Sequence, residues 1–361
     1  MSSIRSVANL ARSSASFRRK NESASRNMGD TLPFVSVIMP IRNEAAFIER
    51  SLGAVLAQDY PHDRMEVLVA DGMSTDGTRA VVERLVAQHA DIPVHLVDNP
   101  GQIVPTGFNA ALARARGDVI VRVDGHTIVA PNYVRECVAA IERSGADNVG
   151  GPMRAVGTTA FGQAVALATS SPFGVGGARF HYSDREEWVD TVYMGAWPRR
   201  VFENLGGFDP ELVRNQDDEF NYRLRAHGGR ILLSPRIRSQ YYNRTSTRSL
   251  WRQYYQYGFY KVRVLQKHPR QMRVRQFVPP AFVAAILGGA LLSPLSKKIR
   301  AVWQLVVIAY TGANLAVSWR IARKHGWTHI WRLPVVFAIL HFSYGLGFLH
   351  GLIHFRGRWK Q

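Results

Sequence analysis

Two short apolar runs in the sequence end at acidic residues that could bind a ligand. Asp71 follows the run 67–70, and Asp124 follows the run 119–123, with His126 two residues later. A carboxylate and an imidazole at this spacing on a strand end can face one ligand. Mg²⁺ and Mn²⁺ prefer oxygen ligands and Mn²⁺ accepts imidazole, so Asp124 and His126 are a candidate metal site that would bridge a diphosphate to the protein. The competing interpretation is a strand-ending turn at Asp124, with His126 incidental.

A second group of acids is formed by Asp217, Asp218 and Glu219. Three adjacent carboxylates repel one another, so some of them must form ion pairs or bind a ligand. A loop carboxylate at this place could act as a general base. The alternative is an acidic first turn of a helix, stabilised by the helix dipole, in which Arg223 and Arg225 pair with the acids.

Polar residues also follow the first apolar run, at 35–40. Asn43 and Glu44 could accept hydrogen bonds from ribose hydroxyls or base N–H groups, or they could cap a helix. Asp71 has the same ambiguity, since the segment 74–78 that follows it has the composition of a cap and turn. The residues alone leave both interpretations open.

Several common classes of enzyme are excluded by the motifs that the sequence lacks. It has no GxxxxGK[ST] run, no GxGxxG after the first strand, no GxSxG and no HExxH. These absences remove the common NTPases, dehydrogenases, hydrolases and zinc proteases. The single cysteine, Cys137, excludes a disulfide scaffold and a Cys-rich zinc module.

Strands and helices alternate from residue 33 onward, and they must position these polar residues. The predicted strands cover 35–40, 66–70, 94–97 and 118–123, and the predicted helices cover 45–58, 75–89 and 103–116. This alternation predicts an α/β fold with a doubly wound, mostly parallel sheet. Such sheets bind ligands beyond the carboxyl ends of their strands, which is where Asp71 and Asp124 are expected.

The charge of the chain, +19 overall, is divided unequally. All 27 acids lie at or before Glu219, and the 142 residues after it carry 24 Lys+Arg. This asymmetry predicts contact with an anionic surface, either a membrane or a nucleic acid. Residues 1–32 are rich in Ser and Arg and have no apolar run, so they are predicted to be a disordered basic tail.

The C-terminal part has the pattern of membrane helices. Segments 277–295, 302–319 and 333–355 hold no charged residue and are 19, 18 and 23 residues long, near the length that crosses a bilayer. They predict a membrane region over 276–361 with two or three transmembrane helices. Three full spans would place some basic clusters on the wrong side of the positive-inside rule. In the alternative, one segment lies in the interface, and the first, which contains Pro and Gly, is the candidate.

The segment before these helices is basic and aromatic. Residues 244–261 interleave Arg with Trp and Tyr, which suit lipid phosphates and the membrane interface. We therefore expect basic aromatic interfacial helices over 241–275. A nucleic acid is the less favoured partner for this segment, because charge-free segments follow it directly.

The motifs, taken in order, resemble the family 2 glycosyltransferases. The matching pieces are PIRNE, VLVADGMSTDGT, GFNAALARARGD, VIVRVDGH, ENLGGFDP and QDDEFNYRLR, spread over residues 33–225. The resemblance implies a nucleotide-diphospho-sugar transferase (GT-A-like) catalytic domain over 33–240, followed by the C-terminal membrane helices. The whole chain is similar to membrane-attached bacterial exopolysaccharide glycosyltransferases of the succinoglycan biosynthesis type.

The resemblance implies roles for the matching positions on the donor and acceptor sides. Asp124 would be the first residue of the family's Asp-x-Asp metal and diphosphate motif, in which His126 occupies the second acidic position. The other implied contacts are Pro40, Asn43, Glu44 and Asp71 for the nucleotide sugar, and Trp197, Gly207, Phe208 and Asp209 for the acceptor side.

The resemblance also implies a base and a reaction. Counting six residues back from Arg223 gives Asp217 as the base, with Asp218 as the alternative. The implied reaction is an inverting transfer from a nucleotide-diphosphate sugar, with UDP as the expected carrier and Mn²⁺ or Mg²⁺ as cofactor, to a lipid-linked saccharide in cell-surface polysaccharide synthesis. The expected location is the bacterial inner membrane, with anionic lipid around the helices, the catalytic domain in the cytoplasm and no nucleic-acid partner.

Two alternatives to this activity stay open. One is sugar transfer directly to a polyprenyl phosphate. The more remote one is a membrane-anchored basic scaffold that binds a nucleic acid or an acidic polymer without chemistry, which the basic C-terminal region would allow.

Overall fold

The computed structural model describes residues 32–359, which form two compact units. The first unit comprises the residues up to 154 and residues 183–241, and the second comprises residues 155–182 and those from 242 onward. The tail expected over 1–32 lies outside the described residues, except for Leu32. Residues 155–182 were expected in the catalytic domain, but they cluster with the C-terminal helices, because the apolar helix that they contain packs against those helices.

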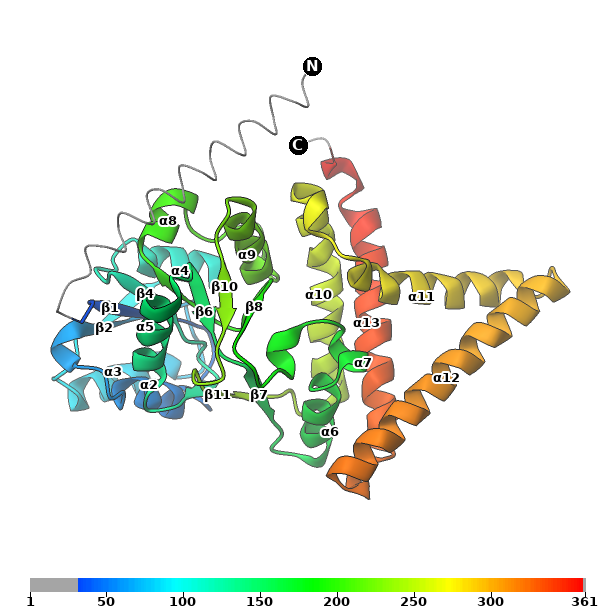
Figure 1. The fold of residues 1–361 in the computed structure, drawn as a ribbon, viewed down its shortest axis with the longest axis horizontal. Helices are drawn as coiled ribbons and strands as arrows, with labels where there is room; N and C mark the ends of the chain where they lie inside the picture. The colour runs from blue at the N-terminus through cyan, green and yellow to red at the C-terminus, as the bar shows by residue number, and fades with distance from the viewer. Residues whose placement is uncertain (1–31, 360–361) are drawn as a thin grey trace, which may run out of the picture. The chain divides into compact units, whose positions relative to one another are not determined.

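The first unit is built around an eight-stranded sheet with the order β3-β2-β1-β4-β9-β6-β10-β8 (Figure 1). Strands β1 to β4 pair in parallel, whereas β9 is antiparallel to β4 and β8 is antiparallel to β10. A three-stranded sheet has the order β5-β11-β7. The predicted mostly parallel α/β sheet is confirmed. The strands are β1 (Val35–Ile41), β2 (Met65–Asp71), β3 (Val94–Asp98), β4 (Val119–Arg122), β5 (Thr127–Val129), β6 (Asn148–Gly150), β7 (Met153–Val156), β8 (Glu187–Val189), β9 (Ala196–Pro198), β10 (Ile231–Leu233) and β11 (Ser239–Tyr242).

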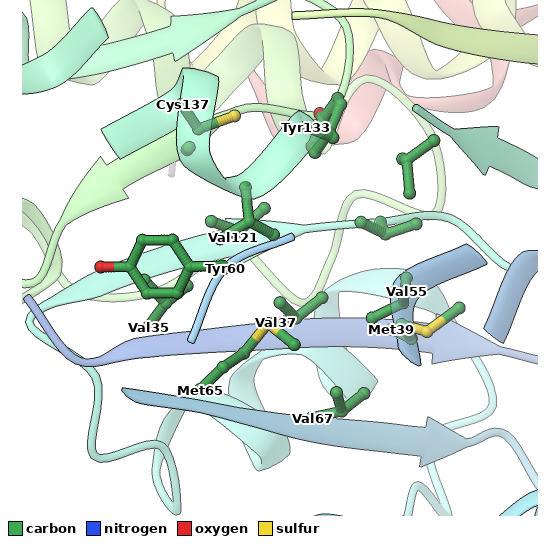
Figure 2. Close-up of a cluster of buried hydrophobic side chains, with 14 of the residues drawn as sticks. Val35, Val37, Met39, Val55, Tyr60, Met65, Val67, Val121, Tyr133 and Cys137 are labelled. Carbon is green, nitrogen blue, oxygen red and sulfur yellow. The ribbon is translucent and has the colours of Figure 1, made fainter. Parts of the chain in front are cut away.

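Helices cover both faces of this sheet. Figure 2 shows Val37 and Met39 of β1 in one apolar cluster with Val55 of the first covering helix. Since alternate residues of a strand face opposite sides, Ile38 is buried on the other face. The near-continuous apolar runs of β1 and β2 are therefore explained by burial on both sides. The helices of this unit are α2 (Ile48–Leu56), α3 (Thr78–Gln88), α4 (Val104–Leu112), α5 (Tyr133–Ser144), α8 (Arg200–Leu205) and α9 (Gln216–Ala226).

The ends of the strands determine where the polar side chains lie. Ile41 at the end of β1 is opposite Asp71, whereas Arg122 at the end of β4 is opposite Ile38. The chain that leaves β4 therefore turns beside the last residues of β1. A Cβ atom at Gly125 would lie 2.9 Å from Cγ2 of Ile41, so a glycine is needed for this close approach.

The second unit is helical. Its helices are α6 (Ala160–Thr169), α7 (Pro172–Val175), α10 (Thr247–Lys267), α11 (Val274–Leu292), α12 (Lys297–His325) and α13 (Arg332–His354). The last three are long and apolar enough to cross a membrane. Helices α10 and α13 lie side by side (Figure 1), and a Cβ atom at Gly258 would be only 2.0 Å from the carbonyl oxygen of Tyr344. The three predicted apolar segments are thus three separate helices, and one of them packs closely on α10.

Candidate active site

The loops that follow β1 and β2 are hydrogen-bonded to each other. The backbone N–H of Asn43 donates to Oγ of Ser74 at 2.9 Å, and the N–H of Thr75 donates to Oδ1 of Asn43 at 2.9 Å. The N–H of Glu44 donates to Oγ1 of Thr78 at 2.8 Å. Asn43 adopts a positive φ of 53°, which Asn tolerates better than most residues. The two loops thus form one rigid edge beyond the strand ends.

Asp71 is at this edge and is almost completely buried, with 1% exposed. Its Oδ1 accepts a 2.5 Å hydrogen bond from the hydroxyl of Ser74, and Nη1 of Arg79 lies 3.9 Å from its Oδ2. The carboxylate therefore closes a local turn, as one of the two interpretations of the sequence expected. Pro40, which precedes the edge, is buried within β1.

Glu44 and His126 connect the edge at β1 with the turn after β4. Nδ1 of His126 lies 3.0 Å from Oε1 of Glu44, and the edge of its ring faces Tyr241 with the ring centroids 5.4 Å apart. About a fifth of each side chain is exposed, 23% for His126 and 21% for Glu44. His126 is therefore held by a carboxylate and an aromatic ring, in a position that a ligand can still reach.

Arg122 and Asp124 form a buried ion pair at the end of β4. Nε of Arg122 donates to Oδ1 of Asp124 at 2.8 Å, and the guanidinium lies 5.8 Å from the ring centroid of Phe208. Burial lowers the pKa of Arg122, but the attraction of Asp124 and Asp217 outweighs burial and holds the pKa above its ordinary value. Among the described residues, Nη1 of Arg122 is buried without a hydrogen-bond partner.

Asp217 is in the first turn of α9, and it interacts electrostatically with Arg122 and Asp124. Burial raises the pKa of Asp217, and repulsion from Asp218 and Asp124 adds to this effect, whereas Arg122 opposes it. The N–H of Asp218 donates to Oδ1 of Asp217 at 2.9 Å. The structure thus brings two of the predicted site residues, Asp124 and Asp217, to the same buried arginine.

The third acid of the group has a structural role. Oε1 of Glu219 accepts a hydrogen bond from Nε of Arg223 at 2.6 Å. The alternative interpretation of the acids expected this pairing. The same arginine donates to the carbonyl oxygens of Leu205 and Gly207, both at 2.7 Å. Arg223 therefore fixes the loop before α9 to the helix that carries Asp217.

The side chains expected on the acceptor side lie deeper than the sequence suggested. Trp197 and Phe208 are only 1% and 2% exposed, because their rings pack together with those of Phe108, Phe202 and Phe220. They support the Arg122 side of the site from the core. Gly207 contributes a backbone carbonyl, and Asp209 accepts a hydrogen bond from the N–H of Glu211 at 3.0 Å.

Arg122 is the residue that the sequence analysis passed over. It lies in the apolar run before Asp124 and was not predicted to be a site residue. The signal was present, because an arginine inside an apolar strand is unusual and residues two apart share a face of the strand. Period-two spacing therefore places Arg122 and Asp124 on the same side.

Asp124 and His126 can hold a divalent ion only if a bound substrate supplies further ligands to that ion. Oδ1 of Asp124 and Nδ1 of His126 are already used by Arg122 and Glu44, so each side chain has at most one further donor atom. Within residues 32–359 there is no group of three or more His, Cys, Asp or Glu that could hold a metal ion. Mg²⁺ sites commonly use one or two protein ligands plus substrate phosphates, and imidazole adds a preference for Mn²⁺.

Comparison with a family model, with curated proteins and with solved structures finds similarity to glycosyltransferases in each case. The family model described as glycosyl transferase family 2 matches residues 36–206. The succinoglycan biosynthesis protein ExoA of Rhizobium meliloti is 30% identical over 326 residues, covering 89% of this chain and 96% of that protein. A dolichyl N-acetyl-α-D-glucosaminyl phosphate 3-β-D-2,3-diacetamido-2,3-dideoxy-β-D-glucuronosyltransferase of Methanococcus voltae is 25% identical, covering 89% of this chain and 97% of that protein.

One solved structure shares the fold over nearly the whole chain. It is the mannosyltransferase PcManGT from Pyrobaculum calidifontis in complex with GDP-Man and Mn²⁺. The TM-score is 0.60 at 21% identity, and the match covers 93% of this chain and 96% of that chain.

Proposed function

Because the chain belongs to the family 2 glycosyltransferases, we propose that it transfers a sugar, with inversion, from a nucleotide-diphosphate sugar to a lipid-linked saccharide. The observation that carries the proposal is the arrangement of Asp124 and Asp217 around the buried guanidinium of Arg122. In this arrangement Asp124 is the carboxylate on the leaving-group side and Asp217 is the carboxylate on the acceptor side. The scaffold alternative is set aside, because the chain is a glycosyltransferase.

In this proposal the donor lies across the carboxyl ends of β1, β2 and β4. Asn43, Glu44 and Asp71 border the nucleotide, next to Pro40, and the diphosphate lies toward Asp124. The joined loops after β1 and β2 support this, since a rigid edge positions a donor without an ordering cost. UDP is proposed as the carrier because it is usual in the family.

Asp124 and His126 are the residues that would hold a divalent cation, Mn²⁺ or Mg²⁺. Such an ion, when bound, supplies positive charge to the leaving diphosphate. Arg122 supplies a fixed positive charge at the same place, and its buried Nη1 is a further donor for an anionic group. The protein's own contribution is thus an arginine N–H donor at the end of β4, beside the residues that would hold the ion.

Asp217 is proposed as the general base, with Asp218 as the alternative. As the acceptor oxygen forms its bond to the anomeric carbon, its proton passes to the carboxylate and the bond from that carbon to the diphosphate breaks. One displacement from the opposite face inverts the configuration. A pKa raised by burial supports this role, because a base whose pKa is closer to the working pH accepts a proton more readily.

The acceptor class rests on the relatives and on the helices of the second unit. The names of the two relatives refer to succinoglycan biosynthesis and to a dolichyl-linked sugar phosphate. Three helices of this chain are long and apolar enough to cross a membrane. We therefore place the enzyme at the bacterial inner membrane, with an acceptor carried on lipid and the catalytic unit in the cytoplasm.

The proposal is tested with full-length protein in lipid, given labelled UDP-sugars and GDP-sugars and a polyprenyl diphosphate oligosaccharide or polyprenyl phosphate. Radiolabel in the oligosaccharide lipid, with the opposite anomeric configuration, is expected. Transfer only to polyprenyl phosphate would favour the alternative acceptor, and retention of configuration would contradict the single displacement. Asp217→Asn is compared with Asp59→Asn, which changes a solvent-accessible carboxylate paired with Arg135 outside the proposed site.

A further inference from the structure

Helix α13 resembles a transmembrane span in composition but not in its surroundings. It is 23 residues long with a mean hydropathy of 1.6. Half of its apolar stretch is buried inside the protein, compared with 11% for α11 and 11% for α12. Helices α11 and α12 are thus mostly open to their surroundings, and α13 is half covered by protein.

The cover is mainly α10, which runs beside α13 in the same direction (Figure 1). A Cβ atom at Gly347 would lie 2.0 Å from the carbonyl oxygen of Tyr255, and one at Gly351 would lie 2.7 Å from that of Phe259. Further along, Nε2 of Gln266 donates to the carbonyl oxygen at 355, at 2.8 Å. Residue numbers increase together along both helices, so the contact is parallel and extends over several turns.

Helix α10 is poorly suited to the hydrocarbon of a bilayer. It carries five cations, Arg248, Arg252, Lys261, Arg263 and Lys267, and no acid. Lys261 and Arg263 are 5% and 6% exposed, so they cannot extend freely to the lipid headgroups. If α13 crossed the bilayer, the close contact would bring these cations into the bilayer with it, which is costly for charged side chains.

We propose that α11 and α12 enter the bilayer as a hairpin, while α10 and α13 lie together at its surface. The uncovered apolar side of α13 then contacts the acyl boundary, and the exposed cations of α10, Arg248 and Arg252, contact anionic headgroups. The interfacial segment is therefore the last of the three, not the first as the sequence suggested. This inference uses the membrane location in the proposed function, and none of its chemistry.

The positions of the basic clusters support the hairpin. With a hairpin, ten of the Lys and Arg residues from 270 onward lie on the side from which α11 enters, and only Lys297, Lys298 and Arg300 lie on the far side. With three spans, seven of these residues would lie on the side from which α11 enters and six on the far side. Since cations concentrate on the cytoplasmic side of membrane proteins, the hairpin fits this rule and the three spans do not.

The test is labelling of single cysteines in whole cells with a membrane-impermeant maleimide. Cys137 is the sole cysteine and is buried, so Cys137→Ala gives a silent background. Ser296→Cys reports on the turn between α11 and α12, and Gln361→Cys reports on the C-terminus. Glu83→Cys, on an exposed side chain of the first unit, is the control for the cytoplasmic side.

The hairpin predicts labelling of Ser296→Cys in intact cells, and labelling of Gln361→Cys and Glu83→Cys only after permeabilisation. Labelling of Gln361→Cys in intact cells would mean three spans and overturn the proposal. Absence of labelling at Ser296→Cys before permeabilisation would mean that α11 does not cross, which also overturns it. The readout does not depend on sugar transfer, so it fails or succeeds separately from the proposed activity.

Discussion

Arg122 and Asp124 occupy alternate positions of one chain segment and are joined by a 2.8 Å hydrogen bond from Nε to Oδ1. The side chains are 5% and 13% exposed, so the pair is shielded from water. The same guanidinium also attracts Asp217, which comes from a helix that begins 92 residues after Asp124. A single arginine thus links the proposed donor side to the proposed base.

Loss of the Arg122 charge is expected to affect stability and transfer together. Arg122→Gln leaves the buried Asp124 without its cation, which costs about 3 kcal/mol. Thermal unfolding measures this loss. Arg122→Lys keeps the charge but not the planar fork, so it should recover part of the stability. Arg135→Gln, which removes an exposed pair with Asp59, should change stability by less than about 1 kcal/mol.

The pH dependence of transfer should reflect the electrostatic interaction between Arg122 and Asp217. Asp217 must be ionised to accept a proton, and burial raises its pKa, so activity should fall at a higher pH than for an ordinary aspartate as the solution is acidified. Arg122 opposes this shift. Arg122→Gln should therefore move the acidic limb of kcat/KM further up in pH. If the acidic limb of the residual activity in Arg122→Gln stays at the same pH, Arg122 does not influence the ionisation of the base.

Asp217→Asn is expected to lower transfer by about 10²–10⁴-fold, the usual contribution of a general base. Binding of UDP, measured by calorimetry, should change little, because the proposed base contacts the acceptor hydroxyl. Asp218→Asn is the matched variant from the same helix turn. A larger loss in Asp218→Asn than in Asp217→Asn would reassign the base.

The imidazole at 126 should give the enzyme a preference for Mn²⁺. Nucleotide binding is expected to weaken in EDTA and to be restored better by Mn²⁺ than by Mg²⁺. His126→Asp replaces the imidazole with a carboxylate, so Mg²⁺ should then support binding as well as Mn²⁺ does. Calorimetry of UDP with each ion checks this, and equal Mn²⁺-to-Mg²⁺ ratios in both proteins would argue against His126 as a ligand.

The contact between α10 and α13 should not accept a methyl group. At Gly258 the new Cβ atom of Gly258→Ala would meet the backbone carbonyl of Tyr344 at 2.0 Å, so the helices must separate, at a cost of about 1–3 kcal/mol. Gly312→Ala in α12 has nothing within 4 Å of its Cβ atom and should stabilise its helix by up to about 1 kcal/mol. Thermal unfolding in detergent compares the two, and equal effects would contradict the close contact.

The order of elements in the first unit could be predicted from local pattern. The runs at 35–40 and 66–70 are apolar throughout, and both are strands buried on two faces. The short strands β6, β8, β9 and β10 were not predicted, because three residues are too few to show a period. Their placement depends on pairing between distant segments, such as β4 with β9.

Burial was harder to predict than position in the chain. Trp197 and Phe208 belong to motifs near the acceptor side, yet their rings are buried by three phenylalanines from α4, α8 and α9. The role of Arg122 was missed although a charge inside an apolar strand is unusual, because its interaction with Asp217 joins segments far apart in the sequence. A local sequence pattern does not report which long-range neighbours a side chain will meet.

The second unit contains no Asp or Glu, which has a consequence for how it responds to its surroundings. Without acidic side chains, acidification can only add positive charge to it. The proposed attraction of this unit to anionic lipid would therefore not be weakened by protonation of its own side chains at low pH, whereas added salt would screen it. The strength of the proposed contact between α10 and the headgroups would then follow the fraction of anionic lipid and the ionic strength, whereas the hairpin of α11 and α12 keeps the enzyme in the membrane under all of these conditions.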